Sequence, residues 1–300
     1  GMMSNGDAIS ASVVFRTCLA NGLASGFAVS CCNPMDVLRV RWQVRGSDSA
    51  RQSLTAFTLS RFREEGLVEL WRCGLAANGV SVGASSFIRM GSYPFVRDMM
   101  VSTVDGSGFQ IPSATCKGAA GFVCGTLGYW LATPLYQCKI MLQAGPRGTL
   151  PYSGFIDCLQ KINAEGGVSL LYRGGAVLAV RGAFFTAGQM LGYDVTKSEA
   201  KAAGVTDGPV LHIGASVSAA FMATTFSMPA DVLLARYSVG SQRGEFTSPL
   251  QCAAVLLKTE GPGTFFRGWG LGFTRLIPVM LIAMPAMEQL RWAFGLGYLS

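Results

Sequence analysis

The chain has 300 residues, of which 50% are hydrophobic and only 14% are charged, with a mean hydropathy of +0.38. Soluble domains usually carry about 25% charged residues, so this composition argues against an ordinary cytosolic enzyme and excludes a disordered chain. The 24 lysines and arginines exceed the 17 acids and give a net charge of +7, which favours an anionic lipid or solute as a partner. No run of five basic residues occurs, and this argues against nucleic acid.

Six apolar stretches are long enough, or nearly so, to form membrane-spanning helices of about 20 residues. They run over residues 11–33, 74–96, 113–133, 176–196, 210–228 and 271–296. Pairs such as Gly22 and Gly26 have the spacing that lets membrane helices approach closely. The sequence therefore predicts an all-α membrane protein. An even number of spans places both termini on the same side.

One pattern recurs three times along the chain, at spacings of 100 and then 95 residues. In each copy a proline follows an apolar run, an acid–glycine pair comes 31 residues later, and an aromatic–arginine pair follows. The copies are Pro34, Glu65 and Trp71-Arg72; Pro134, Glu165 and Tyr172-Arg173; and Pro229, Glu260 and Phe266-Arg267. Such periodicity predicts three tandem units, at 1–100, 101–200 and 201–300, each with two spanning helices and a short surface helix.

The repeated signature, proline with an acid and bases at fixed offsets and then aromatic–arginine, resembles that of the mitochondrial carrier family over nearly the whole chain. The resemblance implies six transmembrane helices in three pseudosymmetric repeats, with short matrix helices. It implies a multi-pass protein of the mitochondrial inner membrane with both termini on the intermembrane-space side. It also implies one central substrate site that opens alternately to either side, and no cofactor.

The first set of charges follows the repeated prolines. The resemblance implies that each acid pairs with a base of the next repeat, which gives Asp36–Lys139 and Arg39–Asp231 as two ion pairs of a matrix gate. In the third position Tyr136 faces Leu234. Two glutamines match the braces that lie beneath such pairs, and they are Gln43 and Gln143.

A second set of charges lies on the even-numbered spans, where the pattern is aromatic-acid-x-x-base. The resemblance implies a cytoplasmic gate with the pairs Arg97–Asp194 and Lys197–Glu288, and with Arg291 as the remaining base. Pro94 stands where the first copy would have its acid. The alternative interpretation is that both sets of charges are static and only hold the helices together.

Residues between the two gates are candidates for substrate contact. Thirteen residues before the second-layer acid positions the copies have Ser81, Arg181 and Arg275. Thirteen helical residues span about 20 Å, which places these side chains near mid-membrane. Arginine binds carboxylate or sulphate groups bidentately and keeps its proton. Further candidates are Gly182, Arg89 and Gln189. The alternative roles are helix packing for Arg181 and Arg275 and a lipid contact for Arg89.

The ends of the surface helices resemble cardiolipin sites of the family, in which helix N-termini meet lipid phosphates. The matching residues are Arg72, Gly154, Arg173, Gly174, Arg267 and Gly268. Cys73 stands where glycine is usual, and we expect this to weaken the first site.

The choice of substrate rests on a narrower likeness. Tyr136, Leu234 and the stretch Arg89–Tyr93 resemble the oxaloacetate and dicarboxylate–sulphate carriers. This implies exchange of small dianions by alternating access. Two alternatives stay open, namely a non-cycling structural subunit of a larger inner-membrane complex and a leak like that of uncoupling proteins. An enzyme is disfavoured because no catalytic triad, metal set or phosphate loop occurs, and the nine cysteines are expected to be buried hydrophobes.

Overall fold

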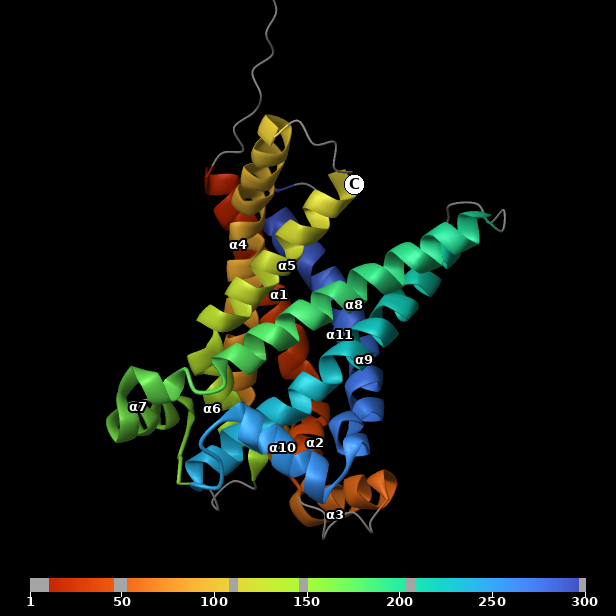
Figure 1. Ribbon diagram of the computed structural model, residues 1–300. Coiled ribbons are helices and arrows are strands. Elements are labelled where there is room, and N and C mark those ends of the chain that lie inside the picture. The colour runs from red at the N-terminus through yellow and green to blue at the C-terminus, as the bar shows by residue number, and fades with distance from the viewer. Residues whose placement is uncertain (1–10, 46–52, 108–112, 146–150, 203–208, 297–300) are drawn as a thin grey trace, which may run out of the picture.

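The computed structural model describes residues 11–45, 53–107, 113–145, 151–202 and 209–296, and the regular structure in these ranges is helical (Figure 1). The first repeat contains α1 (Ala11–Cys31), α2 (Asn33–Val44), α3 (Leu54–Arg72) and α4 (Leu75–Ser107). The second contains α5 (Ser113–Leu131), α6 (Thr133–Ala144), α7 (Phe155–Leu171) and α8 (Gly175–Ala202). The third contains α9 (Pro209–Gln242), α10 (Pro249–Thr259), the short 3-10 helix η2 (Pro262–Phe266) and α11 (Trp269–Ala293).

The long helices form a bundle, and the short helices α3, α7 and α10 lie towards one end of it (Figure 1). The start of α1 and the end of α11 lie at the opposite end (Figure 1). The first and last described helices therefore reach the same side of the bundle.

The repeated prolines interrupt the first helix of two repeats. Pro34 and Pro134 lie in the first turns of α2 and α6, where a missing N–H costs nothing. The preceding helices end there because proline cannot donate to the turn before it and its ring clashes with that turn. In the third repeat α9 continues through Pro229. The odd-numbered spans are therefore α1–α2, α5–α6 and α9.

Glycines with positive φ shape the connection from each surface helix to the next span. Gly74, Gly174 and Gly268 have φ values of 61°, 86° and 84° directly before α4, α8 and α11. Only glycine adopts this left-handed conformation without strain. The structure therefore corrects the expectation about Cys73, because the glycine is kept at Gly74. Cys73 instead occupies the place that Arg173 and Arg267 take in the other copies.

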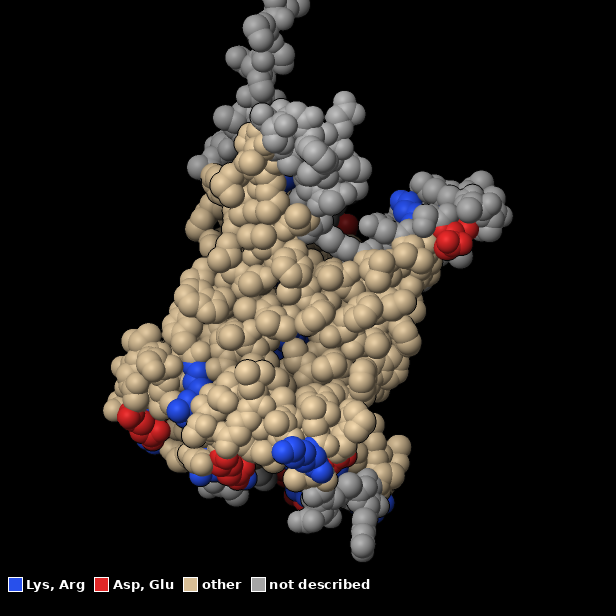
Figure 2. Space-filling view, in the orientation of Figure 1, with Lys and Arg blue, Asp and Glu red and all other residues tan. Residues whose placement is uncertain are grey.

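The outer surface of the bundle suits a lipid environment. Figure 2 shows a broad middle band with very little charge, most of the visible charged side chains near the end that carries the surface helices, and a few at the tip of the opposite end. By length and hydropathy alone, three described helical segments qualify as spans, at Ser12–Cys31, Gly214–Gln242 and Pro262–Ala293, and the bent pair Phe155–Leu171 with Gly175–Gln189 could add a fourth. The remaining predicted spans fall on α4 and α5. Helix α4 carries Asn78, several serines and Arg89, as expected of a helix that lines a polar space.

Helix contacts depend on small residues at a few positions. A Cβ atom added at Gly26 of α1 would lie 2.8 Å from the carbonyl oxygen of Gly79 in α4. Because real Cβ contacts are longer, only glycine permits this approach of the two backbones. The spacing of Gly22 and Gly26 thus reports a real helix interface, whereas an added Cβ at Gly214 would meet nothing within 4 Å.

Candidate substrate cavity and its gates

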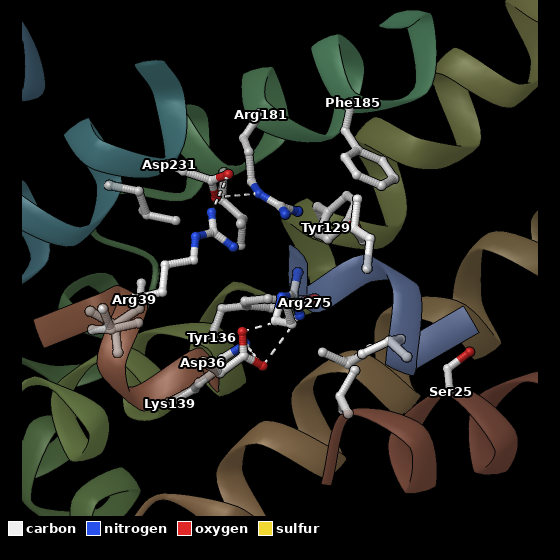
Figure 3. Close-up of a pocket in the computed structure, with 18 of the residues that line it drawn as sticks. Ser25, Asp36, Arg39, Tyr129, Tyr136, Lys139, Arg181, Phe185, Asp231 and Arg275 are labelled. Atoms are coloured by element: carbon white, nitrogen blue, oxygen red, sulfur yellow. Dashed lines mark hydrogen bonds and ion pairs between the residues drawn. The ribbon is translucent and has the colours of Figure 1, made fainter. Parts of the chain in front are cut away.

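A cavity of about 240 Å³ lies at the centre of the bundle and receives side chains from all three repeats (Figure 3). Five bases and two acids line it, so the lining carries three positive charges in excess. The bases are Arg39, Arg89, Lys139, Arg181 and Arg275, and the acids are Asp36 and Asp231. Such a cavity attracts anions.

Asp36 of α2 joins two cations from the other two repeats. Its Oδ2 lies 3.8 Å from Nζ of Lys139 in α6, and its Oδ1 lies 3.1 Å from Nη1 of Arg275 in α11. Asn78 of α4 donates a further hydrogen bond to it at 2.9 Å. Since Asp36 is only 2% exposed, these contacts supply the compensation that a buried charge requires.

Asp231 of α9 makes the matching junction on the other side of the cavity (Figure 3). Its carboxylate lies 2.5 Å from Nη2 of Arg39 in α2 and 2.6 Å from Nε of Arg181 in α8. This acid therefore also ties together all three repeats. Both ion pairs expected from the repeat register are present, and each acid binds in addition an arginine that the sequence placed in a separate layer.

The third edge of this inner layer is apolar. Tyr136 and Leu234 are 7% and 5% exposed and belong to one hydrophobic cluster. The Tyr136 hydroxyl lies 3.3 Å from the Ser85 hydroxyl. Packing replaces an ion pair here, because neither side chain carries a charge.

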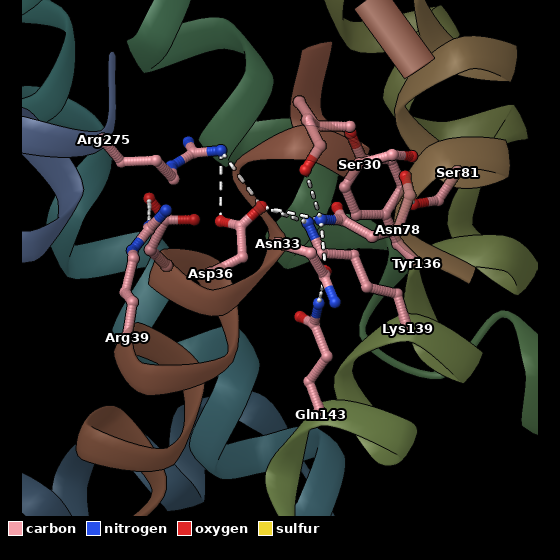
Figure 4. Close-up of polar contacts among 12 residues, drawn as sticks. Ser30, Asn33, Asp36, Arg39, Asn78, Ser81, Tyr136, Lys139, Gln143 and Arg275 are labelled. Carbon is pink, nitrogen blue, oxygen red and sulfur yellow. Dashed lines mark hydrogen bonds and ion pairs between the residues drawn. The ribbon is translucent and has the colours of Figure 1, made fainter. Parts of the chain in front are cut away.

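A network of buried side-chain amides lies beside Asp36 and supports it (Figure 4). Asn33 accepts hydrogen bonds from Asn78 at 2.8 Å and from Gln143 at 2.9 Å, and it donates to the Trp71 and Cys73 carbonyls. Gln143 thus supports the inner layer indirectly, through its hydrogen bond to Asn33, and lies outside the cavity lining. Gln43, in contrast, lines the cavity. The roles of Asn33 and Asn78 were missed by sequence reasoning. An asparagine directly before the repeated proline was the available signal.

One wall of the cavity is cationic and aromatic. Arg181 lies over the rings of Tyr129 and Phe185, with its guanidinium carbon 5.1 and 5.5 Å from their centroids. Arg89 lies 5.5 Å from the centroid of the same Tyr129 ring. Gln189 also lines the cavity. Tyr129 and Phe185 were not singled out from the sequence.

Two of the candidate substrate residues lie outside the cavity lining. The Ser81 hydroxyl is fully buried and donates to the Asn78 carbonyl at 3.1 Å. A Cβ atom at Gly182 would lie 2.4 Å from a ring carbon of Tyr129. Gly182 therefore makes room for an aromatic side chain, and the space it leaves is already filled.

The outer layer shows a different arrangement from the inner one. Arg97 pairs with its neighbour Asp98 at 2.7 Å, and the side chain of Asp194 lies outside the described residues. Within the described part of the chain no ion pair joins Lys197 to Glu288. Arg291 makes contacts of its own near the end of α11. The inner layer is thus closed. The predicted outer pairs stay predictions, because the side chain of Asp194 lies outside the described residues and Lys197 has a contact of its own.

The residues expected at lipid sites divide into two groups. A second cavity, of about 120 Å³, is lined by Arg72, Gly74, Tyr152 and Gly154 at the starts of α4 and α7. Burial raises the pKa of Tyr152 to about 12, and its hydroxyl donates to Gln242 at 2.6 Å. The second cavity thus has both polar and apolar lining residues and lies between the first two repeats.

In the other two copies the arginine forms a hydrogen bond to a different repeat. Arg173 donates to the Ser241 carbonyl at 3.3 Å, and Arg267 donates to the Arg45 carbonyl at 3.0 Å. Gly174 and Gly268 supply the turns beside them. In the first copy Cys73 holds this place and donates to the Leu142 carbonyl at 3.1 Å.

Three repeated helix pairs around a central basic cavity are the architecture of a membrane transport protein that is built from internal repeats. The family described as mitochondrial carrier protein matches residues 10–103, 112–202 and 206–296. The chain therefore belongs to the mitochondrial carrier family, whose members are multi-pass transport proteins of the mitochondrial inner membrane.

Named relatives are similar over almost their full length. A protein of Sus scrofa, described as a mitochondrial transporter, UCP3, is 30% identical over 92% of this chain and 91% of its own. The mitochondrial dicarboxylate transporter of Saccharomyces cerevisiae is 30% identical over 90% of each chain. The mitochondrial dicarboxylate carrier of Caenorhabditis elegans is 28% identical over 91% of this chain and 92% of its own.

Proposed function

We propose that this carrier exchanges small dianions, in particular dicarboxylates and sulphate-like anions, by alternating access. The observation that carries the proposal is the pair of arginines, Arg181 and Arg275, that reach the central cavity from different repeats and there bind carboxylates. A guanidinium that already holds an aspartate has the geometry to hold a substrate carboxylate. The relatives described as dicarboxylate carriers support this choice.

The same contacts provide a way to couple binding to opening. Asp36 and Asp231 each share their charge between a base of the inner layer and one of these arginines. A dianion that takes over both arginines removes one partner from each acid and so weakens the inner layer. Breaking a buried ion pair without replacement costs about 3–5 kcal/mol, whereas an exchange of one carboxylate for another is nearly balanced.

Free donors in the cavity also support anion binding. The Nε atoms of Arg39 and Arg275 are buried and have no hydrogen-bond partner among the described residues. A buried donor without a partner is costly. A carboxylate placed between these guanidinium groups would satisfy them.

The direct test is uptake of labelled malate, oxaloacetate and sulphate into liposomes that contain the purified chain. We expect uptake only when a dianion is present inside. The variants Arg181→Lys and Arg275→Lys keep the charge but lose the planar fork, so each should reduce uptake at least about tenfold, a step of about 1.4 kcal/mol. Arg61→Lys, in a surface pair with Glu64, is the control. Unchanged uptake in both cavity variants would exclude this site.

We propose in addition that the second cavity holds a phosphate of cardiolipin. Arg72 and the unpaired backbone N–H groups at the starts of α4 and α7 line it, and helix N-termini bind phosphate. The side with the surface helices would then face the matrix, and both termini the intermembrane space. Added cardiolipin should raise the melting temperature of delipidated protein, with a smaller rise in Arg72→Gln. An equal rise in both would exclude the role of Arg72.

A further inference from the structure

Tyr129 contacts both cations of the cationic wall, Arg89 and Arg181, and Figure 3 shows it beside Arg181. Its ring lies beneath Arg181 and beside Arg89, and Nη1 of Arg89 donates to its hydroxyl oxygen at 3.3 Å. The side chain is 6% exposed and lines the cavity. The Tyr129 ring packs directly against Gly182 of α8, because Gly182 and Gly125 allow α5 and α8 to approach closely at this point.

The polarity of this hydrogen bond determines what the tyrosine can still do. A guanidinium has only donors, so the Tyr129 oxygen must be the acceptor. The hydrogen of the hydroxyl group is then free to point elsewhere. Within the described residues no acceptor is bonded to it. A buried hydroxyl donor of this kind needs an acceptor oxygen, and a solute that replaces water in the cavity can supply one.

Arg89 differs from the other cavity bases because it has no acidic partner among the described side chains. Arg39, Lys139, Arg181 and Arg275 each lie within 4.0 Å of Asp36 or Asp231. Among the described side chains, no acid lies that close to Arg89. Its guanidinium is therefore ready to bind a solute carboxylate directly beside the Tyr129 hydroxyl.

This arrangement occurs on one wall only. The residues at the Tyr129 position in the other repeats are Val29 and Thr224, and those at the Arg89 position are Gln189 and Ala283. A solute with identical ends would gain nothing from such asymmetry. A solute with an acceptor oxygen next to one carboxylate would fit it.

We propose that Tyr129 is a specificity-determining residue that donates a hydrogen bond to the oxygen at carbon 2 of a 2-hydroxy or 2-oxo dicarboxylate. The adjacent carboxylate binds both Arg89 and Arg181, the two cations that flank the Tyr129 ring, and the other carboxylate binds Arg275. This rests on the proposed dianion transport and deepens it. Tyr129 thereby favours substituted dicarboxylates over unsubstituted ones of the same length. A site that hydrogen-bonds a substrate oxygen rejects the analogue that lacks it, because its own polar group then stays unpaired.

The test compares malate with succinate, which differ only in the 2-hydroxyl group. Dissociation constants are measured by titration calorimetry on the full chain in detergent with cardiolipin. We expect the wild-type protein to bind malate about fivefold to tenfold more tightly, the size of one hydrogen bond. In Tyr129→Phe, which keeps the ring over both cations, the ratio should fall to about one. In Tyr172→Phe, whose ring packs on Trp130 outside the cavity lining, the ratio should stay as in the wild type.

The outcomes separate this inference from the proposed function. A wild-type preference for malate that persists in Tyr129→Phe overturns the role of Tyr129 and leaves dianion transport standing. A wild-type protein that binds both acids equally also overturns it. If the wild type binds neither acid, both proposals are wrong. A ratio lost in Tyr172→Phe as well as in Tyr129→Phe would show a general disturbance of the protein, and that too counts against Tyr129.

Discussion

Replacement of Asp231 by asparagine removes the charge at one of the two junctions that join all three repeats. The carboxylate lies 2.5 Å from Arg39 and 2.6 Å from Arg181, and all three side chains are about 10% exposed. An amide of the same shape leaves two buried guanidinium groups without a counter-charge. Loss of one partner from a buried ion pair costs about 3–5 kcal/mol. At about 2 °C per kcal/mol for a chain of this size, the melting temperature should fall by about 6–10 °C.

The assay is thermal unfolding of the purified chain in detergent, with Glu64→Gln as the matched control. Glu64 pairs with Arg61 at 2.7 Å, but its side chain is 53% exposed, so its loss should cost less than about 1 kcal/mol. A dianion should restore much of the stability of Asp231→Asn, because it can bind the arginines that the acid has left. Equal melting temperatures for the two variants, or no gain on adding malate, would refute the idea that Asp231 and the substrate share these arginines.

Three further predictions follow from the packing. Gly182→Ala places a methyl carbon 2.4 Å from the Tyr129 ring and should weaken malate binding, whereas Gly214→Ala, with nothing within 4 Å, should leave it unchanged or stabilise the helix. Asn33→Ala leaves two buried amide donors without their acceptor and should lower the unfolding free energy by about 1–3 kcal/mol, measured by thermal melting. The Cys252 thiol is buried and its pKa is raised to about 11 by desolvation; maleimide at pH 8 should modify it only after unfolding, and rapid labelling of the native protein would contradict its burial.

The inner ion pairs are predicted from the sequence because the resemblance to the family implies that each acid pairs with a base of the next repeat. Asp36 lies two residues after Pro34 and Lys139 five residues after Pro134, and threefold pseudosymmetry then brings neighbouring copies together. The spacing says nothing about how far a long side chain reaches along the cavity. For this reason the contacts of Arg275 with Asp36 and of Arg181 with Asp231 appear only in the structure.

Departures from the repeat are the least predictable features. Cys73 separates Arg72 from Gly74, whereas Arg173 and Arg267 directly precede Gly174 and Gly268, so the aromatic–arginine motif alone predicts the glycine of the first copy one residue too early. Tyr129 has no equivalent in the other copies, and a lone tyrosine in an apolar helix gives no functional signal. Its importance depends on Arg89 and Arg181, which reach it from two other helices.

The central claim is that a dianion binds between Arg181 and Arg275 in the cavity that Asp36 and Asp231 border. An experimental structure of the chain with bound malate tests it most directly. We predict that the two carboxylates lie within about 3 Å of guanidinium nitrogens, with at least one aspartate moved away from its arginine. Malate bound elsewhere, or a cavity in which both aspartates keep both arginines while malate is bound, would contradict the account.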